Sequence, residues 1–308
     1  MVRVVIFVVM LALVAGCGRT YTTEEARLSN YRLEVVERGR GHASVLMVPI
    51  HGIIAPEGSS APATIAMLRQ LRTLDEPSGI KVILLHVDSP GGDVTTSDVL
   101  AHEVKMCQQK GYKVVAFYGD TAASGAYYAT AGADRIVARP TSIVGSIGVI
   151  MMLFDAQKLL NDKLGVEDQS VVSGPYKDVP SVFRPMTEKE RAYMQNIVDS
   201  LYGRFVDTVA EGRNLSPAEV RKIGDGRVYT ARQAEELGLI DSIGQREEAI
   251  AAARRLAGED ATVIFFRREP SFLEQLVKGG AASGPLPREV QTLMDLALSA
   301  RPLYLWRP

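Results

Sequence analysis

The chain has 308 residues, 46% of them hydrophobic, and its 35 Lys and Arg nearly balance its 36 Asp and Glu. This length is enough to bury a large core, and the balanced charge argues against nucleic acid or another polyanion as the main partner. The only cysteines are Cys17 and Cys107, so no intrachain disulfide can form if Cys17 carries lipid.

The first residues have the pattern of a targeting segment. One cation, Arg3, precedes the apolar stretch Val4 to Val14, which is shorter than the roughly 20 residues of a membrane-spanning helix. Small residues then lead to Cys17 in a pattern that resembles a bacterial lipobox. We therefore expect residues 1–16 to be a lipoprotein signal peptide and Cys17 to carry lipid, including palmitate. A plain secretory signal and a marginal anchor helix are the alternatives.

A lipidated Cys17 also predicts a location. Each buried acyl methylene contributes about 0.8 kcal/mol, so several chains would hold residues 17–43, the expected tether, on a membrane surface. The folded part would lie in the cell envelope and face the periplasm or the cell exterior. Gly18, where Asp could stand, resembles cargo that two-membrane bacteria send on to the outer membrane.

From Ser44 onward the pattern alternates between strands and helices. Uninterrupted apolar runs separated by helices favour an α/β fold with a parallel sheet covered on both faces. The expected strands are Ser44–Ile50, Val82–Val87, Val114–Tyr118, Ile136–Ala138 and a strand near Asp168–Val172. The expected helices in this part are Ala63–Leu74 and Asp155–Leu164.

Beyond Pro185 the chain becomes mainly helical. Thr187 and Glu190 form a capping-box pattern that opens a long helix ending near Glu211. Shorter helices are expected at Pro217–Ile223, Ala231–Leu237 and Gln245–Ala257. These helices need a surface to pack on, and another protomer could supply part of it.

Residues 258–308 read as a C-terminal extension. It contains an expected strand at Val263–Phe266, a small-residue linker at Gly279–Pro287 and a final helix at Arg288–Ala300. The last residues, Leu303 to Trp306, are unusually apolar for a free end. We expect them to dock on the body or on a neighbour, and entry into an active site as a self-substrate is the weaker alternative.

The first segment that could take part in catalysis is Asp88-Ser89-Pro90-Gly91-Gly92, directly after an apolar strand. Two glycines let the backbone turn sharply and bring N–H groups close to a bound carbonyl. This arrangement suits an oxyanion site, although a tight strand-to-helix turn has the same appearance.

Two serines lie among small residues farther along. Ser124, between Ala123 and Gly125, opens a short helix with an accessible hydroxyl, as a nucleophile would, whereas a lone serine there is more often an N-cap. Ser146 lies in Gly145-Ser146-Ile147-Gly148. Its hydroxyl could hold an amine toward Ser124, or it could only satisfy its own backbone.

Lys177, in Tyr176-Lys177-Asp178, is the candidate base because no histidine follows His102. An ordinary lysine has a pKa of about 10.4, so a neutral amine near pH 7 costs about 4 kcal/mol, which burial can supply. A solvated loop lysine is the alternative. We expect the Asp178 carboxylate to point away from the amine.

Together these motifs resemble peptidase family S49 in its short signal peptide peptidase A form, which is related in fold to Clp protease and crotonases. The resemblance covers residues 44–257, in order and near the family's spacing. It implies Ser124 as nucleophile, Lys177 as general base, Ser146 as the residue that orients the lysine, and Gly91, Gly92 and Gly125 as the oxyanion hole. No metal or organic cofactor is implied.

The resemblance also implies partners. Short family members form rings in which the serine of one subunit meets the lysine of the next, and their substrates are apolar peptides such as remnant signal peptides. Many relatives carry a membrane helix, and this chain departs from them in its expected anchor, which is lipid on Cys17.

Three alternatives remain open. A crotonase-like acyl-CoA enzyme fits an exported lipoprotein poorly. A Ser-His-Asp protease is disfavoured because His42, His51, His86 and His102 all precede Ser124, and His86 lies on an apolar strand. A catalytically inactive, peptide-binding envelope scaffold of the same fold is the third.

Overall fold

The computed structural model describes residues 31–73, 79–268 and 302–306. The expected signal peptide, Cys17, Gly18, the linker Gly279–Pro287 and the helix Arg288–Ala300 lie outside these residues. Residues 31–33 and 266–268 belong to a separate compact unit, so the account below concerns residues 34–265 and 302–306.

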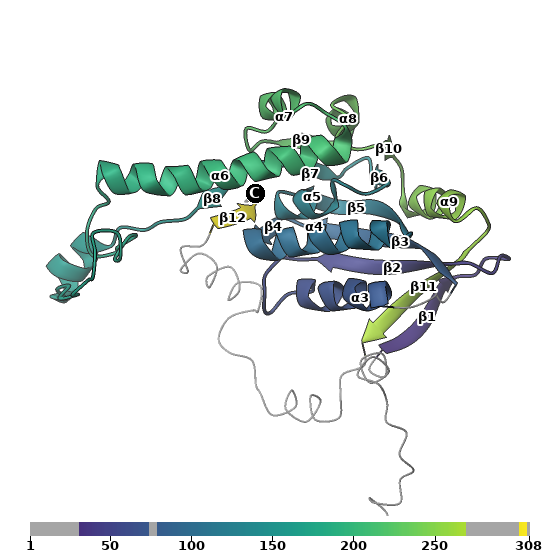
Figure 1. The fold of residues 1–308 in the computed structure, drawn as a ribbon, viewed down its shortest axis with the longest axis horizontal. Coiled ribbons are helices and arrows are strands. Elements are labelled where there is room, and N and C mark those ends of the chain that lie inside the picture. The colour runs from purple at the N-terminus through teal and green to yellow at the C-terminus, as the bar shows by residue number, and fades with distance from the viewer. Residues whose placement is uncertain (1–30, 74–78, 269–301, 307–308) are drawn as a thin grey trace, which may run out of the picture. The chain divides into compact units, whose positions relative to one another are not determined.

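The core is a mainly parallel sheet with the strand order β1-β11-β2-β3-β5-β6-β10 (Figure 1). Each pairing from β11 to β10 is parallel, as the apolar runs predict. A short strand, β7, pairs in parallel with β5 and antiparallel with β9. The strands are β1 (Tyr31–Glu37), β2 (Ser44–His51), β3 (Ile80–Ser89), β5 (Lys113–Ala123), β6 (Arg135–Ala138), β7 (Ile143–Gly145), β9 (Val228–Thr230), β10 (Ser242–Ile243) and β11 (Thr262–Arg268).

Helices cover both faces of this sheet. Val82 and Leu84 of β3 share a buried cluster with Ala253 of α9 (Arg246–Ala257). Their neighbours Ile83 and Leu85 are equally buried and point to the other face because side chains alternate along a strand. There α3 (Ala61–Thr73) packs on β2 and α4 (Val94–Gln109) packs on β5.

The C-terminal helical part agrees closely with the sequence pattern. The capping box of Thr187 and Glu190 opens α6 (Glu188–Arg213), and similar boxes open α7 (Pro217–Ile223) and α8 (Ala231–Glu236). A short helix, α5 (Gly125–Thr130), lies between the sheet and α6. Among the helices of the described residues, none has the length and apolarity that crossing a bilayer demands.

One prediction about the middle of the chain is wrong, and one helix was not predicted. Residues 168–172 form an exposed coil, not a strand, because no described strand is there to pair with them; Val171 is 99% exposed. The expected helix at residues 155–164 is present over residues 157–164, with a π-helical stretch, η1 (Leu159–Lys163), at its centre. The unpredicted helix is α4, which begins at the N-cap Asp93.

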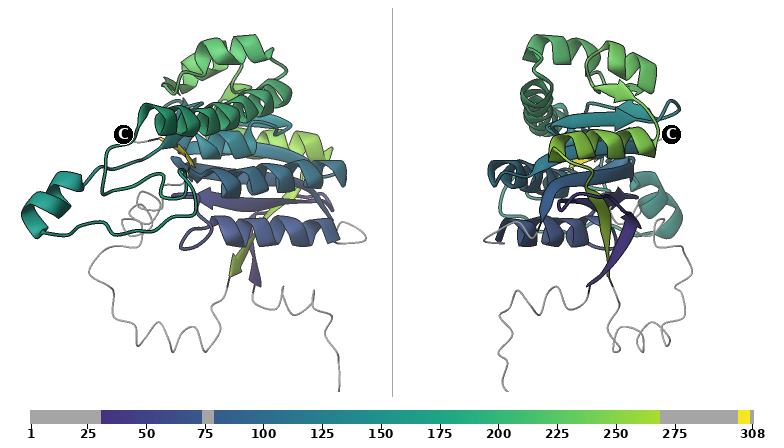
Figure 2. Two further views of the ribbon diagram at one scale, coloured as in Figure 1. Left: turned by 60° about the vertical axis from the view of Figure 1, so that its left-hand side comes forward. Right: turned by 90° about the vertical axis from the view of Figure 1, so that its right-hand side faces the viewer.

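Residues 154–187, which we call the arm, project beyond the sheet together with the first half of α6 (Figures 1 and 2). Ala156 N–H donates to the Val182 carbonyl and closes the arm on itself. Most of the large apolar side chains that are exposed in the described residues lie on the arm: Phe154, Leu159, Leu164, Val166, Val171, Val172, Tyr176 and Val182.

The apolar C-terminal residues dock on the body as a strand, β12 (Pro302–Leu305). It lies between β4 (Gly91–Asp93) and β8 (Ile150–Met151) and is antiparallel to both, forming a second, three-stranded sheet.

Candidate active site

Ser124 occupies the sharp turn between β5 and α5. Its backbone has φ 52° and ψ −118°, a conformation that costs a non-glycine residue roughly 1–3 kcal/mol. Its side chain makes no capping hydrogen bond, so the N-cap alternative does not hold, and the residue is only 1% exposed. The fold therefore imposes backbone strain at the candidate nucleophile.

Ser146 lies beside Ser124 because β5 and β7 end together. Ala123 pairs in register with Gly145, the two residues that precede these serines, and Ser124 N–H donates to the Gly145 carbonyl at 2.7 Å. Ser146 also has a positive φ, of 50°. Apart from Asn214, these two serines are the described non-glycine residues with positive φ. Parallel strand ends thus bring both hydroxyl groups to one edge of the sheet.

The glycine loop approaches Ser124 from β3. Gly91 has φ 92°, and a Cβ there would overlap the Tyr304 carbonyl oxygen and lie 2.5 Å from the Gly125 amide nitrogen. A Cβ on Gly92 would overlap the backbone of Ile54. Both positions need glycine because backbone segments pass too closely for a side chain.

Gly125 lies close to both the glycine loop and the Tyr304 carbonyl oxygen. A Cβ on Gly125 would lie 3.0 Å from the Tyr304 oxygen and 3.2 Å from the Gly92 nitrogen. Gly91 N–H instead donates to the Ser89 hydroxyl at 3.1 Å. The three predicted oxyanion residues, Gly91, Gly92 and Gly125, therefore lie together beside the backbone of Tyr304.

Lys177 is exposed on the arm and does not join this cluster. The Tyr176 ring contacts the Tyr193 ring near the start of α6, at a centroid distance of 5.1 Å. Phe205, which contacts Tyr128 of α5, is twelve residues farther along α6, roughly 18 Å at the helical rise. The lysine of the same chain is thus displaced along α6 from the strand-end serines.

Arg184 connects the arm to the N-terminal end of α6. Its guanidinium bonds both Asp178 and Glu190. Hydrogen bonds from Arg184, and then the Thr187 N–H, lower the pKa of Glu190 to about 2. The Asp178 carboxylate is thereby engaged by arginine, which agrees with the expectation that it turns away from Lys177.

A cleft of about 600 Å³ opens beside Ser146. Val198, Asp199 and Tyr202 of α6 line one side of it, and Asp225 lines another. Leu305 and Trp306 of the C-terminal strand close its remaining side.

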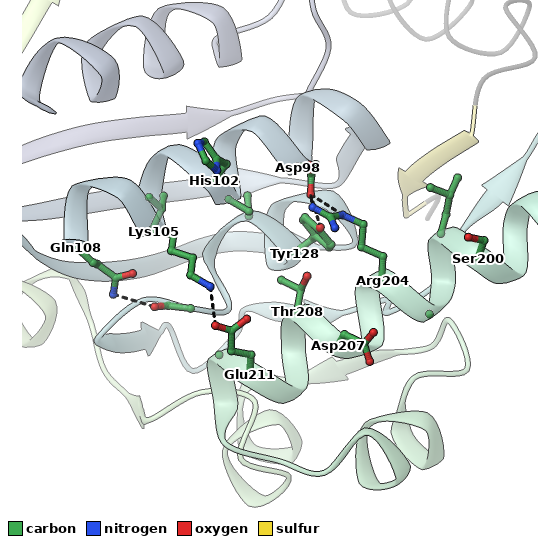
Figure 3. A pocket seen from close by; sticks show the side chains of 17 residues that line it. Asp98, His102, Lys105, Gln108, Tyr128, Ser200, Arg204, Asp207, Thr208 and Glu211 are labelled. Carbon is green, nitrogen blue, oxygen red and sulfur yellow. Dashed lines mark hydrogen bonds and ion pairs between the residues drawn. The ribbon is translucent and has the colours of Figure 1, made fainter. Parts of the chain in front are cut away.

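A larger groove of about 790 Å³ runs between α4 and α6 (Figure 3). Asp98 accepts hydrogen bonds from Tyr128 and Arg204, and Lys105 pairs with Glu211. These paired charges join α4, α5 and α6, so they support the floor of the candidate site.

Histidine is a poor candidate base here. His86 stacks on Phe117, its register partner on β5, and Phe117 precedes Ser124 by seven residues, roughly 20 Å of strand. Burial, and then the neighbouring His51, lower the pKa of His86 to about 4. Within the described residues, no cluster of three or more His, Cys, Asp or Glu side chains is arranged to hold a metal.

Some residues at the site were not anticipated from sequence. Ser97 donates its hydroxyl to the Asp93 carbonyl and lies against Gly125, while Ile54 N–H donates to the Gly91 carbonyl. Ser97 reaches the loop from the first turn of α4, a helix that the sequence pattern did not predict, and Ile54 reaches it through a β-bridge to Gly92.

Two family models match the chain: "Peptidase family S49" over residues 106–260 and "Clp protease" over residues 52–144. They overlap across the stretch that carries Ser124. A "Putative protease" of Synechocystis sp. is 36% identical over 258 residues, which are 79% of this chain and 90% of that protein.

A "Putative signal peptide peptidase SppA" of Enterococcus faecium is 36% identical over 243 residues, covering 77% of this chain and 70% of that protein. Among solved structures, a mutant ClpP1 from Listeria monocytogenes superposes with a TM-score of 0.44 and 16% identity. The superposition covers 66% of this chain and 93% of that one.

Proposed function

Since the chain belongs to peptidase family S49, we propose that it is a serine endopeptidase whose nucleophile is Ser124 and whose general base is Lys177 of a neighbouring subunit. The observation that carries this proposal is the convergence of a strained, buried serine with the glycine loop and Gly125. That convergence supplies a nucleophile and amide donors at one place.

The chemistry is acyl transfer. The lysine amine takes the Ser124 proton as the hydroxyl attacks the scissile carbonyl, and the amides of the glycine loop and Gly125 stabilise the oxyanion. The lysinium then protonates the leaving amine, and the neutral lysine activates water to hydrolyse the Ser124 ester. Ser146, beside Ser124, orients the lysine.

The separation of Lys177 from Ser124 supports a site shared between subunits. The arm that carries the lysine exposes a row of apolar side chains, which is typical of a protein interface. The cleft beside Ser146 offers space for an incoming side chain. Enclosure there would favour the neutral amine that a base requires.

The proposed substrates are apolar peptides such as remnant signal peptides, cleaved on the outer side of the cytoplasmic membrane. A lipid on Cys17 would keep the enzyme beside such peptides, in the inner or the outer membrane. The motif that resembles a lipobox and the name of the Enterococcus relative support this part of the proposal.

Peptide hydrolysis by the purified chain tests the dyad. Ser124→Ala and Lys177→Ala should each abolish hydrolysis, whereas Lys163→Ala, an exposed lysine on the same arm, should leave it unchanged. If both dyad variants cleave as well as the parent, the proposal is wrong. If the parent itself binds peptides without cleaving them, the inactive scaffold is the better description.

Mixing the two inactive variants tests the shared site. A site needs an intact serine subunit beside an intact lysine subunit, so random exchange should restore about one quarter of the parental rate. Continued inactivity after mass spectrometry has demonstrated mixed oligomers would place both groups within one chain.

A further inference from the structure

The turn that carries Lys177 is tied to α6 on both sides of the lysine. Tyr176, the preceding residue, contacts the ring of Tyr193 on α6 at a centroid distance of 5.1 Å. Asp178, the following residue, accepts hydrogen bonds of 2.9–3.1 Å from the Arg184 guanidinium. Lys177 itself is exposed between these two contacts. The fold therefore holds the residues on either side of the lysine and leaves its own side chain on the surface.

Arg184 connects the lysine turn to the start of the helix. Its guanidinium also donates to Glu190 at 2.7 and 2.9 Å, and the Glu190 carboxylate accepts the Thr187 N–H where α6 begins. The Glu190 side chain is only 8% exposed, so this pair is better shielded from water than an ion pair on an open surface. A planar guanidinium that bonds two carboxylates fixes direction as well as distance. Arg184 therefore sets the position of Asp178 relative to the first turn of α6.

Farther along, α6 is held against the helix that follows Ser124. Arg204 donates to the Asp98 carboxylate at 2.6 and 2.9 Å, and the Tyr128 hydroxyl of α5 donates to the same oxygen (Figure 3). Glu190 and Arg204 are fourteen residues apart in one unbroken helix, about 21 Å at the helical rise. Within one subunit, α6 is thus a spacer of fixed length between the serine region and the lysine turn.

We propose that Arg184 is a positioning residue for Lys177, and that α6 sets how far this lysine reaches toward the serine of the next subunit. The inference rests on the proposed shared site and deepens it. A turn that is already held in place loses little conformational freedom when the neighbour arrives. A displacement of about 1 Å at a reacting group can lower a rate about a hundredfold. Tyr193 supports the turn from the other side of the lysine.

Loss of the guanidinium should slow the chemistry without weakening substrate binding. In the full chain, Arg184→Gln should lower kcat for peptide hydrolysis about ten- to hundredfold, with KM within about twofold of the parent and an unchanged size in sedimentation. Arg184→Lys should recover only part of the loss, because an ammonium cannot bond Asp178 and Glu190 in the same planar geometry. A parental kcat in Arg184→Gln would overturn the proposal.

The matched control for this charge change is Arg232→Gln on α8. Arg232 is exposed and has no ion pair within the part of the chain that the structure describes. Its substitution should leave kcat at the parental value.

Mixed oligomers show whether the defect belongs to the lysine side of the site, as positioning requires. With Ser124→Ala, the Arg184→Gln subunit supplies the serine and its neighbour supplies a well-placed lysine, so about one quarter of the parental rate should return. With Lys177→Ala, every active site must use a lysine from an Arg184→Gln subunit, so the rate should not exceed about half that of Arg184→Gln alone. A general loss of folding would lower both mixtures alike. Equal rates in the two mixtures would overturn the positioning role.

A second variant covers the case in which Arg184→Gln does not assemble. Tyr193→Ala removes the other contact of the lysine turn, and Tyr193→Phe, which keeps the ring, is its control. The Tyr193→Ala defect should again be relieved by Ser124→Ala subunits and not by Lys177→Ala subunits. Relief by both kinds of subunit, or an equal defect in Tyr193→Phe, would reject the positioning role.

The mixture of Ser124→Ala with Lys177→Ala separates this inference from the function on which it rests. If that mixture is active and the Arg184→Gln defect does not follow the lysine subunit, only the positioning role is rejected. If that mixture stays inactive in demonstrated mixed oligomers, the shared site is rejected, and the positioning of a lysine for the next subunit is rejected with it.

Discussion

At the scale of single residues, the backbone of Ser124 explains more than its hydroxyl. Positive φ at a non-glycine residue persists only where the surroundings enforce it, and here β5, β7 and α5 all bear on one turn. The sequence identified Ser124 by its small neighbours. It could not indicate the strain, because that arises from the register of β5 against β7.

This strain predicts a stability difference between two inactive variants. Glycine adopts φ 52° freely, whereas alanine remains strained, so Ser124→Gly should have a free energy of unfolding about 1 kcal/mol higher than Ser124→Ala. Urea unfolding measures both. The control is Ser200, within α6, where the alanine variant should be more stable than the glycine variant. At Ser124, a glycine variant no more stable than the alanine variant would contradict the assignment of strain.

At the scale of elements, the arm is attached to α6 through charge. Arg184 holds Glu190, which also completes the capping box with Thr187, and it holds Asp178 next to Lys177. The sequence predicted the capping box because its two residues are three apart. The arginine was missed, since the arm has no regular structure that fixes its spacing.

The ion pair between Arg184 and Glu190 predicts that stability depends on pH with a definite sign. The pKa of Glu190 is lowered in the folded chain, so the carboxylate contributes stability above its ordinary pKa and loses it as the pH falls from about 4.5 toward 2. Unfolding midpoints measured across this range should fall more steeply for the parent than for Glu190→Gln. Parallel curves would show that the ion pair between Arg184 and Glu190 contributes nothing to the stability of the fold.

At the scale of the whole molecule, two features of the described residues have no partner within the chain: a row of exposed apolar side chains on the arm, and a cleft beside Ser146 that Lys177 does not line. The proposed assembly would account for both. A second copy would cover the arm and bring a lysine to each serine.

A charge placed on the arm should therefore block assembly without unfolding the subunit. Val171→Glu, at a side chain that is 99% exposed, should leave the thermal midpoint of the isolated subunit unchanged while sedimentation shows smaller species and hydrolysis is lost. Leu256→Glu on α9, also an exposed apolar position, is the matched control and should keep the parental size. Full assembly of the Val171 variant would rule out the arm as the interface.

The sequence by itself determined the elements whose signals are local. Apolar runs specified the parallel strands, capping boxes specified where the C-terminal helices begin, and glycine and serine motifs specified the residues that meet at the strand ends. Such patterns depend on neighbours a few positions away. Only the tertiary structure decided that residues 168–172 form no strand, that Lys177 lies apart from Ser124, and that residues 303–305 pair with Gly91–Asp93. Each of these depends on which unpaired backbone edge or apolar surface the folded chain leaves available, and no local pattern encodes that.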